Sequence, residues 1–199
     1  IVNDMRYAAY QTGWGGPDYL ESAKLRLISG TDGVPAEEEE PVWPGRLVTE
    51  GDRVDIRMYC MGTNSLYGML ARSYTVGEPS EQTKAMWETA RKAQQIAAAA
   101  LVPGVLLRDV ARLVNEFLDS RGYQRDPHTF LHGLGYVVGE APLLYHPSEE
   151  LPLAKNMVIV IEPTVSDGVH QPLCCGDAFV VTPEGGKRLG TFPQELIRL

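Results

Sequence analysis

The sequence has few cysteines, no long apolar run and no excess of basic residues, and each absence excludes a class of protein. Its three cysteines, Cys60, Cys174 and Cys175, form no C-x-x-C spacing, which argues against a disulfide framework and a structural zinc site. The longest apolar run, Ile96–Val102, is too short to span a membrane, and we expect a cytoplasmic protein. The net charge of −8 argues against nucleic acid and anionic membranes as partners, because both require a basic surface.

What the sequence does contain is a set of strand patterns. Val54, Ile56 and Met58 alternate with charged neighbours in Gly51–Tyr59, and Ser65–Gly77 forms a second such segment. The turn residues between these segments favour an antiparallel pair. Further strands are expected in three segments: Lys24–Gly30, Asn156–Pro163 and Ala178–Thr182.

Two helices are predicted between these strands. Glu81–Leu101 is rich in helix-forming residues and follows Ser80, a good N-cap. A second helix spans Leu107–Arg121 and stops at Gly122. Its expected apolar face consists of Val110, Leu113, Val114, Phe117 and Leu118. Short strands with two central helices, and no alternation of strand and helix, indicate an α+β domain.

A weak internal repeat is also present. Gly51–Arg57 and Asn156–Glu162 are both strand segments that start at a turn residue and finish six positions later with a charged residue. The repeat aligns Arg57 with Glu162. Taken alone it proves little, because many pairs of strands can be aligned in this way.

The segment His128–Pro142 contains two histidines four residues apart, followed by glycines and an acidic residue. Histidines at this spacing can bind a metal from one face of a helix, but Gly133 and Gly135 follow His132 at once and disfavour a helix. The histidines could instead transfer protons in a polar pocket. Equally, they could be hydrogen-bonded to the backbone without any chemical role.

Several motifs, in order over nearly the whole chain, resemble the family of creatinase, aminopeptidase P and methionine aminopeptidase. His128–Pro142 resembles its H-x-x-x-H-G-x-G…H-E-x-P segment, although Gly139 replaces the last histidine. NMVIVIEP resembles its G-M-V-x-T-I-E-P strand, and GDAFVVTPEGGKRLGTFPQEL resembles its closing segment. EGDRVDI and ARSYTVG resemble its first-half motifs. The resemblance implies a pita-bread fold over residues 1–199, with two pseudo-symmetric halves around a curved antiparallel sheet, and with the family's first helix upstream of Ile1.

The resemblance also implies where a metal centre would lie. The family holds two divalent metals with two aspartates, one histidine and two glutamates, and a bridging water is the nucleophile. In this chain the five positions fall on Arg57, Met69, His132, Glu162 and Gly176. A shift of one residue would place Met58 at the first position, but the internal repeat favours Arg57. Two dications need about four negative charges to offset them. We therefore expect no metal and no other cofactor.

Without metals, the same positions imply a different site. Arg57 is expected to face Glu162, and either pairs with it or binds a substrate carboxylate; alternatively, Arg57 points to solvent. The predicted catalytic residues are His132, Glu162 and His128. The residues predicted to contact substrate are Arg57, Tyr59, Met69, Arg72, His170 and Cys175. A nucleophilic cysteine near His170 is conceivable, although small buried residues are the commoner role of cysteine.

Three functions are consistent with this pattern. Creatinase is a precedent for metal-free chemistry on this fold, so the first is a metal-independent enzyme acting on a small amino-acid-like or peptide-like substrate. C–N hydrolysis or a related elimination would use His132 or His128 as acid and base, with Glu162 as anchor. The second is a non-catalytic binder of peptides or proteins, whose charge of −8 suits a basic ligand. The third is an Xaa-Pro-type metallopeptidase with displaced ligands, of which Asp55 is the best candidate, followed by Asp52 and Asp177. A homodimer is expected from the resemblance.

Overall fold

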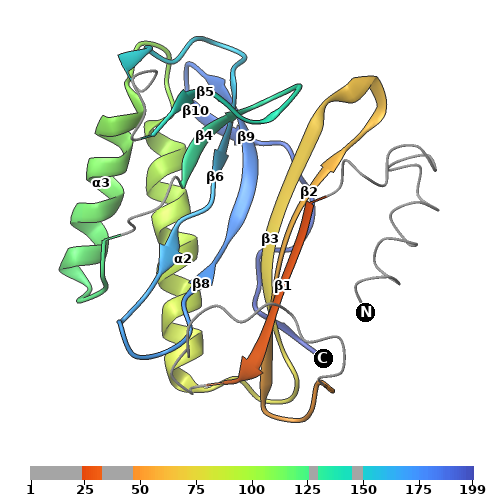
Figure 1. Ribbon diagram of the computed structural model, residues 1–199. Helices are drawn as coiled ribbons and strands as arrows, with labels where there is room; N and C mark the ends of the chain where they lie inside the picture. Colours follow the sequence, from red (N-terminus) through yellow and green to blue (C-terminus); the bar gives the residue numbers. More distant parts are fainter. Residues whose placement is uncertain (1–23, 33–46, 126–129, 145–149) are drawn as a thin grey trace.

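The computed structural model of the chain describes residues 24–32, 47–125, 130–144 and 150–199 (Figure 1). The first half contains β1 (Lys24–Thr31), β2 (Asp52–Met61), η2 (Thr63–Ser65), β3 (Tyr67–Thr75), α2 (Glu81–Ala100) and α3 (Leu107–Ser120). The second half contains β4 (Leu131–Leu134), β5 (Val138–Leu143), β6 (Val158–Ile161), β7 (Thr164–Val165), β8 (Leu173–Cys174), β9 (Gly176–Thr182), β10 (Gly185–Arg188) and β11 (Ile197–Arg198). No helix in these ranges is long and apolar enough to cross a membrane.

Among the described residues, nine strands form one sheet in the order β1-β2-β3-β9-β6-β4-β5, with β10 beside β9 and β11 beside β3. Except for the parallel pairing of β11 with β3, the neighbouring strands are antiparallel. The first-half and second-half strands meet where β3 pairs with β9, at Leu70 opposite Asp177 and Ala71 opposite Gly176. This junction brings residues far apart in sequence onto neighbouring strands.

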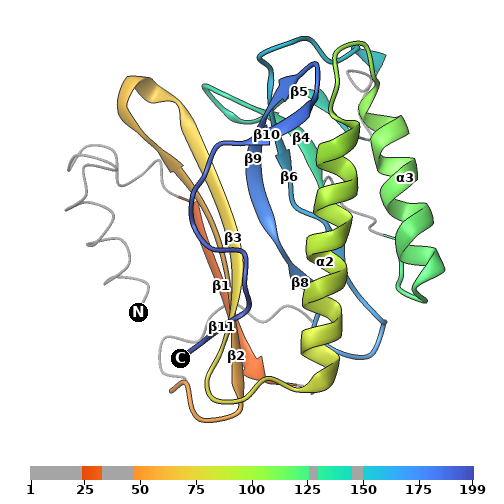
Figure 2. The same cartoon turned by 180° about the vertical axis from the view of Figure 1, so that it is seen from behind.

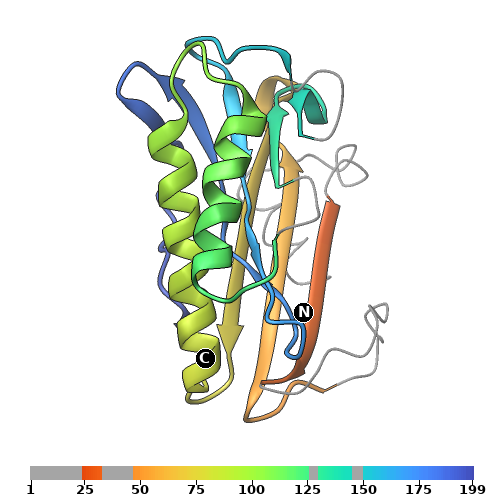
Figure 3. The same cartoon turned by 90° about the vertical axis from the view of Figure 1, so that its left-hand side faces the viewer.

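Both helices lie side by side against the same face of the curled sheet (Figures 1 and 3). Seen from behind, α2 runs along the sheet, and the C-terminal segment lies beside β3 (Figure 2). The larger buried core fills the space between these helices and the sheet, and includes Trp87, Leu118, Ile161 and Phe179. We call the opposite side of the sheet, turned away from α2 and α3, the distal face.

The helices follow the sequence pattern closely, with one exception. Ser80 caps α2, since its Oγ accepts a hydrogen bond from the backbone N–H of Thr83 at 3.1 Å. Gly122 follows α3 with φ of 77°, the left-handed conformation that glycine adopts easily at a helix end. Leu113 was expected on the apolar face of α3, but its side chain is 40 % exposed. The stripe formed by Val110, Val114 and Leu118 is sufficient to bury this helix.

Candidate functional site

The pairing of strands at the junction lines up four residues across the sheet. Arg57 on β2 lies opposite Ala71 on β3, and Ala71 lies opposite Gly176 on β9. Glu162 directly follows Ile161, the residue of β6 that pairs with β9 beside this point. Neighbouring strands are about 4.8 Å apart, so Arg57 and Glu162 are separated by three strand spacings. Because alanine and glycine lie between them, the two long side chains can meet over the sheet.

The side chains of Arg57 and Glu162 form an ion pair on the distal face. Nε of Arg57 lies 3.1 Å from Oε2 of Glu162, and the Arg57 side chain is 31 % exposed whereas that of Glu162 is 8 % exposed. The alignment does not meet hydrogen-bond geometry: Oε2 of Glu162 has no hydrogen-bond partner among the described residues. The pair is therefore held by charge, and the expected contact of these two residues is present.

Tyr59 connects this pair to the histidine of the motif. Its hydroxyl donates a hydrogen bond to Oε1 of Glu162 at 2.8 Å and lies 3.3 Å from Nε2 of His132. Nε2 of His132 is itself 3.7 Å from Oε1 of Glu162. Burial, together with the Glu162 carboxylate, raises the pKa of the Tyr59 phenol well above its usual range, so the phenol stays protonated.

The protonation of His132 is constrained by its other nitrogen. Nδ1 lies 2.8 Å from the carbonyl oxygen of Gly133, which only accepts, so Nδ1 carries a proton. If Nε2 is also protonated, it donates to the Tyr59 oxygen, while the phenolic proton goes to Oε1 of Glu162. If Nε2 is neutral, it competes with Glu162 for the single phenolic proton.

Met69 fills the space beside Gly176. A Cβ atom at Gly176 would lie 2.5 Å from Cε of Met69, 2.9 Å from Cβ of Ala71 and 3.0 Å from Cβ of Glu162. Contacts this short force neighbouring atoms to move. The methionine and a larger side chain at position 176 are therefore mutually exclusive in this arrangement.

Cys174 is the cysteine on the Arg57 side of the sheet. Its thiol donates to the carbonyl oxygen of Glu162 at 3.3 Å and also contacts Arg57. Burial raises the pKa of the Cys174 thiol to about 12, although the guanidinium acts in the opposite direction. At neutral pH the sulfur is a thiol and not a nucleophilic thiolate. Cys175 was the cysteine predicted to contact substrate, but alternation along the strand from Gly176 places Cys174, and not Cys175, on the same face as Arg57.

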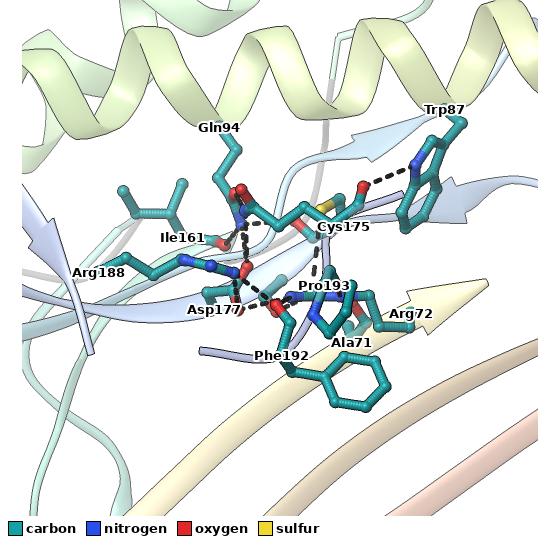
Figure 4. Close-up of polar contacts among 12 residues, drawn as sticks. Ala71, Arg72, Trp87, Gln94, Ile161, Cys175, Asp177, Arg188, Phe192 and Pro193 are labelled. Atoms are coloured by element: carbon teal, nitrogen blue, oxygen red, sulfur yellow. Dashed lines mark hydrogen bonds and ion pairs between the residues drawn. The ribbon is translucent and has the colours of Figure 1, made fainter. Parts of the chain in front are cut away.

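Arg72 and Cys175 lie on the helix side of the sheet, which corrects the expectation that they line the same surface as Arg57. Figure 4 shows Arg72 reaching Asp177 and the C-terminal segment beneath α2. Its guanidinium is 1 % exposed and donates to Asp177 at 2.8 Å and to Pro193 O at 2.7 Å. Cys175 is fully buried in the larger core, and burial raises its pKa to about 12. Both side chains face α2, because successive residues of a strand alternate between faces.

His170, also predicted as a site residue, pairs with Asp167 and does not join the group around Glu162. Nδ1 of His170 lies 2.5 Å from Oδ2 of Asp167, and no contact in the described ranges links His170 to either Cys174 or Cys175. His128 lies outside the described residues. Glu140 of the motif caps the turn between β4 and β5, since its carboxylate accepts from the backbone N–H groups of the turn at 2.6 and 3.1 Å.

The acidic residues considered as displaced metal ligands are engaged elsewhere. Asp55 lies on the same strand face as Arg57, but it pairs with Arg53 at 3.0 Å and accepts from Ser73. Asp177 faces α2, and Asp52 accepts from the backbone N–H of residue 49. Within the described parts of the chain, no group of three or more histidine, cysteine, aspartate or glutamate side chains could hold a metal ion.

Comparison with known proteins identifies the family. The model of metallopeptidase family M24 matches residues 28–188. The chain belongs to metallopeptidase family M24. An uncharacterized peptidase of Bacillus subtilis is 31 % identical to this M24 chain over 161 residues, which cover 77 % of the chain and 43 % of the relative. An Xaa-Pro dipeptidase of Pyrococcus horikoshii is 31 % identical over 133 residues, covering 64 % of the chain and 36 % of the relative.

A solved structure supports the same conclusion. The prolidase of Thermococcus sibiricus superposes with a TM-score of 0.81 at 26 % identity, covering 99 % of the M24 chain and 52 % of the prolidase. The predicted α+β pita-bread fold is confirmed by this likeness and by the curled antiparallel sheet with its two helices. The chain spans about half the length, or less, of the relatives it matches.

The residues at the family's metal positions do not fit two divalent metals. A guanidinium stands at the first position and would repel a cation, and a methionine stands at the second. The fifth position, Gly176, has no side chain, and Met69 occupies the space where one would begin. Only His132 and Glu162 could act as ligands, and the carboxylate is already paired with Arg57.

Proposed function

We propose that this chain is a metal-independent member of family M24 that acts on a small amino-acid-like or peptide-like substrate. Membership of the family makes hydrolysis of a C–N bond, or a related elimination, the reaction class to test first. The observation that carries the proposal is the ion pair of Arg57 with Glu162, 3.1 Å apart at the family's metal position. A permanent positive charge there replaces the charge that a metal would supply.

The described residues offer one route for a proton. Tyr59 and His132 lie 3.3 Å apart, with Glu162 next to both, so a proton can pass between phenol, imidazole and carboxylate. Arg57 is the most exposed member of this group and can bind a substrate carboxylate through its guanidinium. In this proposal His132 exchanges the proton, Tyr59 relays it and Arg57 orients the substrate.

A second candidate, a non-catalytic binding domain, is favoured by a different observation. The residues Tyr59, His132 and Glu162 are 8 %, 4 % and 6 % exposed, and they hydrogen-bond to one another. A base held in this way is poorly placed to accept a proton from a substrate. Cys174, whose pKa is raised, does not supply a nucleophile. Binding through Arg57 alone would use only the exposed part of the group.

The deciding experiment is an activity screen of the purified protein, with and without chelator, after its metal content is measured. The substrates are dipeptides, including Xaa-Pro dipeptides, and guanidino acids. Turnover that survives the chelator and is abolished in both Glu162→Gln and His132→Ala supports the proposed enzyme. Binding without turnover supports the second candidate. Near-stoichiometric manganese, cobalt, iron or zinc, with turnover that the chelator abolishes, refutes both and supports a metallopeptidase with displaced ligands.

A further inference from the structure

The clearest sign of a ligand is one oxygen atom of Glu162. This residue is only 6 % exposed, and its Oε1 accepts the hydrogen bond from Tyr59. Its Oε2 is buried and has no hydrogen-bond partner among the residues that the structure describes, although the Arg57 charge lies close. Buried carboxylate oxygens are normally hydrogen-bonded, because leaving one without a donor is costly. Oε2 is therefore ready to accept an N–H group from a ligand.

Arg57 supplies hydrogen-bond donors for the ligand, next to the acceptor oxygen of Glu162. Its side chain is 31 % exposed, and Nε is the atom that faces Glu162. A guanidinium presents its donors in a planar fork that matches the two oxygens of a carboxylate. The exposed part of Arg57 can hold a ligand carboxylate while Glu162 Oε2 accepts a hydrogen bond from the same ligand.

The short distance between the two groups selects the ligand. Because Nε faces Oε2 at 3.1 Å, the donors left for a ligand are the outer nitrogens of the same guanidinium, so the ligand must carry its acceptor and its donor only a few bonds apart. A carboxylate and an N–H group attached to one carbon meet this condition. We infer that the site binds the carboxylate and the adjacent N–H of an α-amino acid, free or at the C-terminus of a short peptide. This inference deepens the proposed function and rests on it, since it requires the metal-free arrangement.

The need for an N–H group at Oε2 narrows the class further. An amino acid whose nitrogen is acylated and closed into a ring, as in a C-terminal proline, has no N–H to offer Oε2. The site should therefore discriminate against C-terminal proline, although one of the similar proteins is an Xaa-Pro dipeptidase.

The test uses three matched probes, titrated calorimetrically into the purified chain in the presence of a chelator. N-acetyl-L-alanine has both groups, N-acetyl-L-proline lacks the N–H, and N-acetyl-L-alanine amide lacks the carboxylate. We expect N-acetyl-L-alanine to bind at least about tenfold more tightly than either of the other probes, because each of those lacks one hydrogen bond to a charged group. Glu162→Gln should weaken N-acetyl-L-alanine about tenfold and reduce its advantage over the proline probe. Arg112→Gln, at an exposed arginine elsewhere, is the control and should change nothing.

The outcomes separate this inference from the proposed function. Equal affinity for the alanine and proline probes, or no binding of any probe, overturns the inference but leaves metal-independent activity standing. A bound metal at the site, with binding that requires it, overturns both. Because the comparison of probes is made on the unaltered protein, it remains decisive even if the Glu162 variant does not fold.

Discussion

Arg57 and Glu162 join the two halves of the sheet through a contact of 3.1 Å between Nε and Oε2. One residue lies on β2, and the other directly follows β6. The contact crosses the two intervening strands at Ala71 and Gly176, the positions where short side chains allow it. A pair of opposite charges therefore connects the two halves across their junction, at the point where β3 pairs with β9.

The first prediction concerns the stability of this pair. Arg57→Gln leaves the buried carboxylate of Glu162 without a counter-charge, and should cost about 1–3 kcal/mol of the free energy of unfolding. When Glu162→Gln is added to the Arg57→Gln variant, part of that loss should be recovered. The double-mutant cycle should then give a coupling free energy between the two residues above about 0.5 kcal/mol. Urea unfolding of the four proteins measures both quantities.

The exposed pair of Arg112 with Glu116, 3.3 Å apart on α3, is the matched control for this cycle. Both of its side chains are more than half exposed, so its coupling should lie near about 0.3–0.5 kcal/mol. If the Arg57 cycle couples no more strongly than this control, the ion pair is not a structural replacement for the metals.

The second prediction concerns the space beside Gly176. Gly176→Ala should destabilise the protein by about 1–3 kcal/mol, because the new Cβ lies within 3.0 Å of three side-chain atoms. Shortening Met69 to alanine in the same protein should relieve part of the strain, so that the double variant loses less than the sum of the single ones. Gly62→Ala is the control, since its nearest atom is 3.6 Å away. Thermal unfolding that ranks Gly62→Ala as the more damaging change would contradict this packing.

Much of this arrangement could be predicted from local patterns. Alternation at Val54, Ile56 and Met58 predicts β2, and the internal repeat together with the order of the motifs predicts that Arg57 faces Glu162. These predictions succeed because strand period and turn residues are local properties of the sequence, and because the family fixes which strands are neighbours. The ends of α2 and α3 follow from caps for the same reason.

Other features depend on contacts that no local pattern encodes. The side on which Cys174 and Cys175 point depends on the short strands β8 and β9, and a shift of one residue exchanges them. Arg72 was predicted to contact substrate, yet it is buried on the helix side of the sheet, where its partners Asp177 and Pro193 lie more than 100 residues away in the sequence. Leu113 is exposed because α3 is buried along the stripe that contains Val110, Val114 and Leu118, and Leu113 lies outside that stripe.

The third prediction concerns pH and the Asp167–His170 turn. Burial alone would raise the pKa of Asp167, but hydrogen bonds from His170 and from the backbone N–H of Val169 outweigh it and lower the pKa to about 2. A carboxyl whose pKa is lower in the folded state stabilises the fold above about pH 4, and this contribution disappears as the pH falls toward 2. In His170→Ala the pKa of Asp167 should rise toward its ordinary value. Carboxyl titration by carbon NMR measures this shift, and an unchanged Asp167 would show that the His170 imidazole, as distinct from its backbone N–H, does not lower the pKa.

The fourth prediction concerns the buried network beneath α2, in which Asp177 is the central acceptor. Its carboxylate receives hydrogen bonds from Arg72 at 2.8 Å, Gln94 at 3.1 Å and Gln194 at 3.0 Å (Figure 4). Asp177→Asn leaves the guanidinium of Arg72, which is 1 % exposed, without its counter-charge. The expected loss is about 3–5 kcal/mol in the free energy of unfolding, as for other broken buried ion pairs. Chemical denaturation measures the loss.

A matched control and a local reporter make this prediction sharp. Arg188 lies 3.6 Å from Asp177 and is 27 % exposed, so Arg188→Gln should cost less than about 1 kcal/mol. The indole of Trp87 donates to the carbonyl oxygen of Gln194 at 3.0 Å and is buried, so its fluorescence reports on the C-terminal segment. Detachment of that segment in Asp177→Asn should shift the Trp87 emission to longer wavelength before global unfolding, since the indole then meets water. Equal losses in the two variants, with unchanged emission, would mean that Asp177 does not hold the C-terminal segment against the sheet.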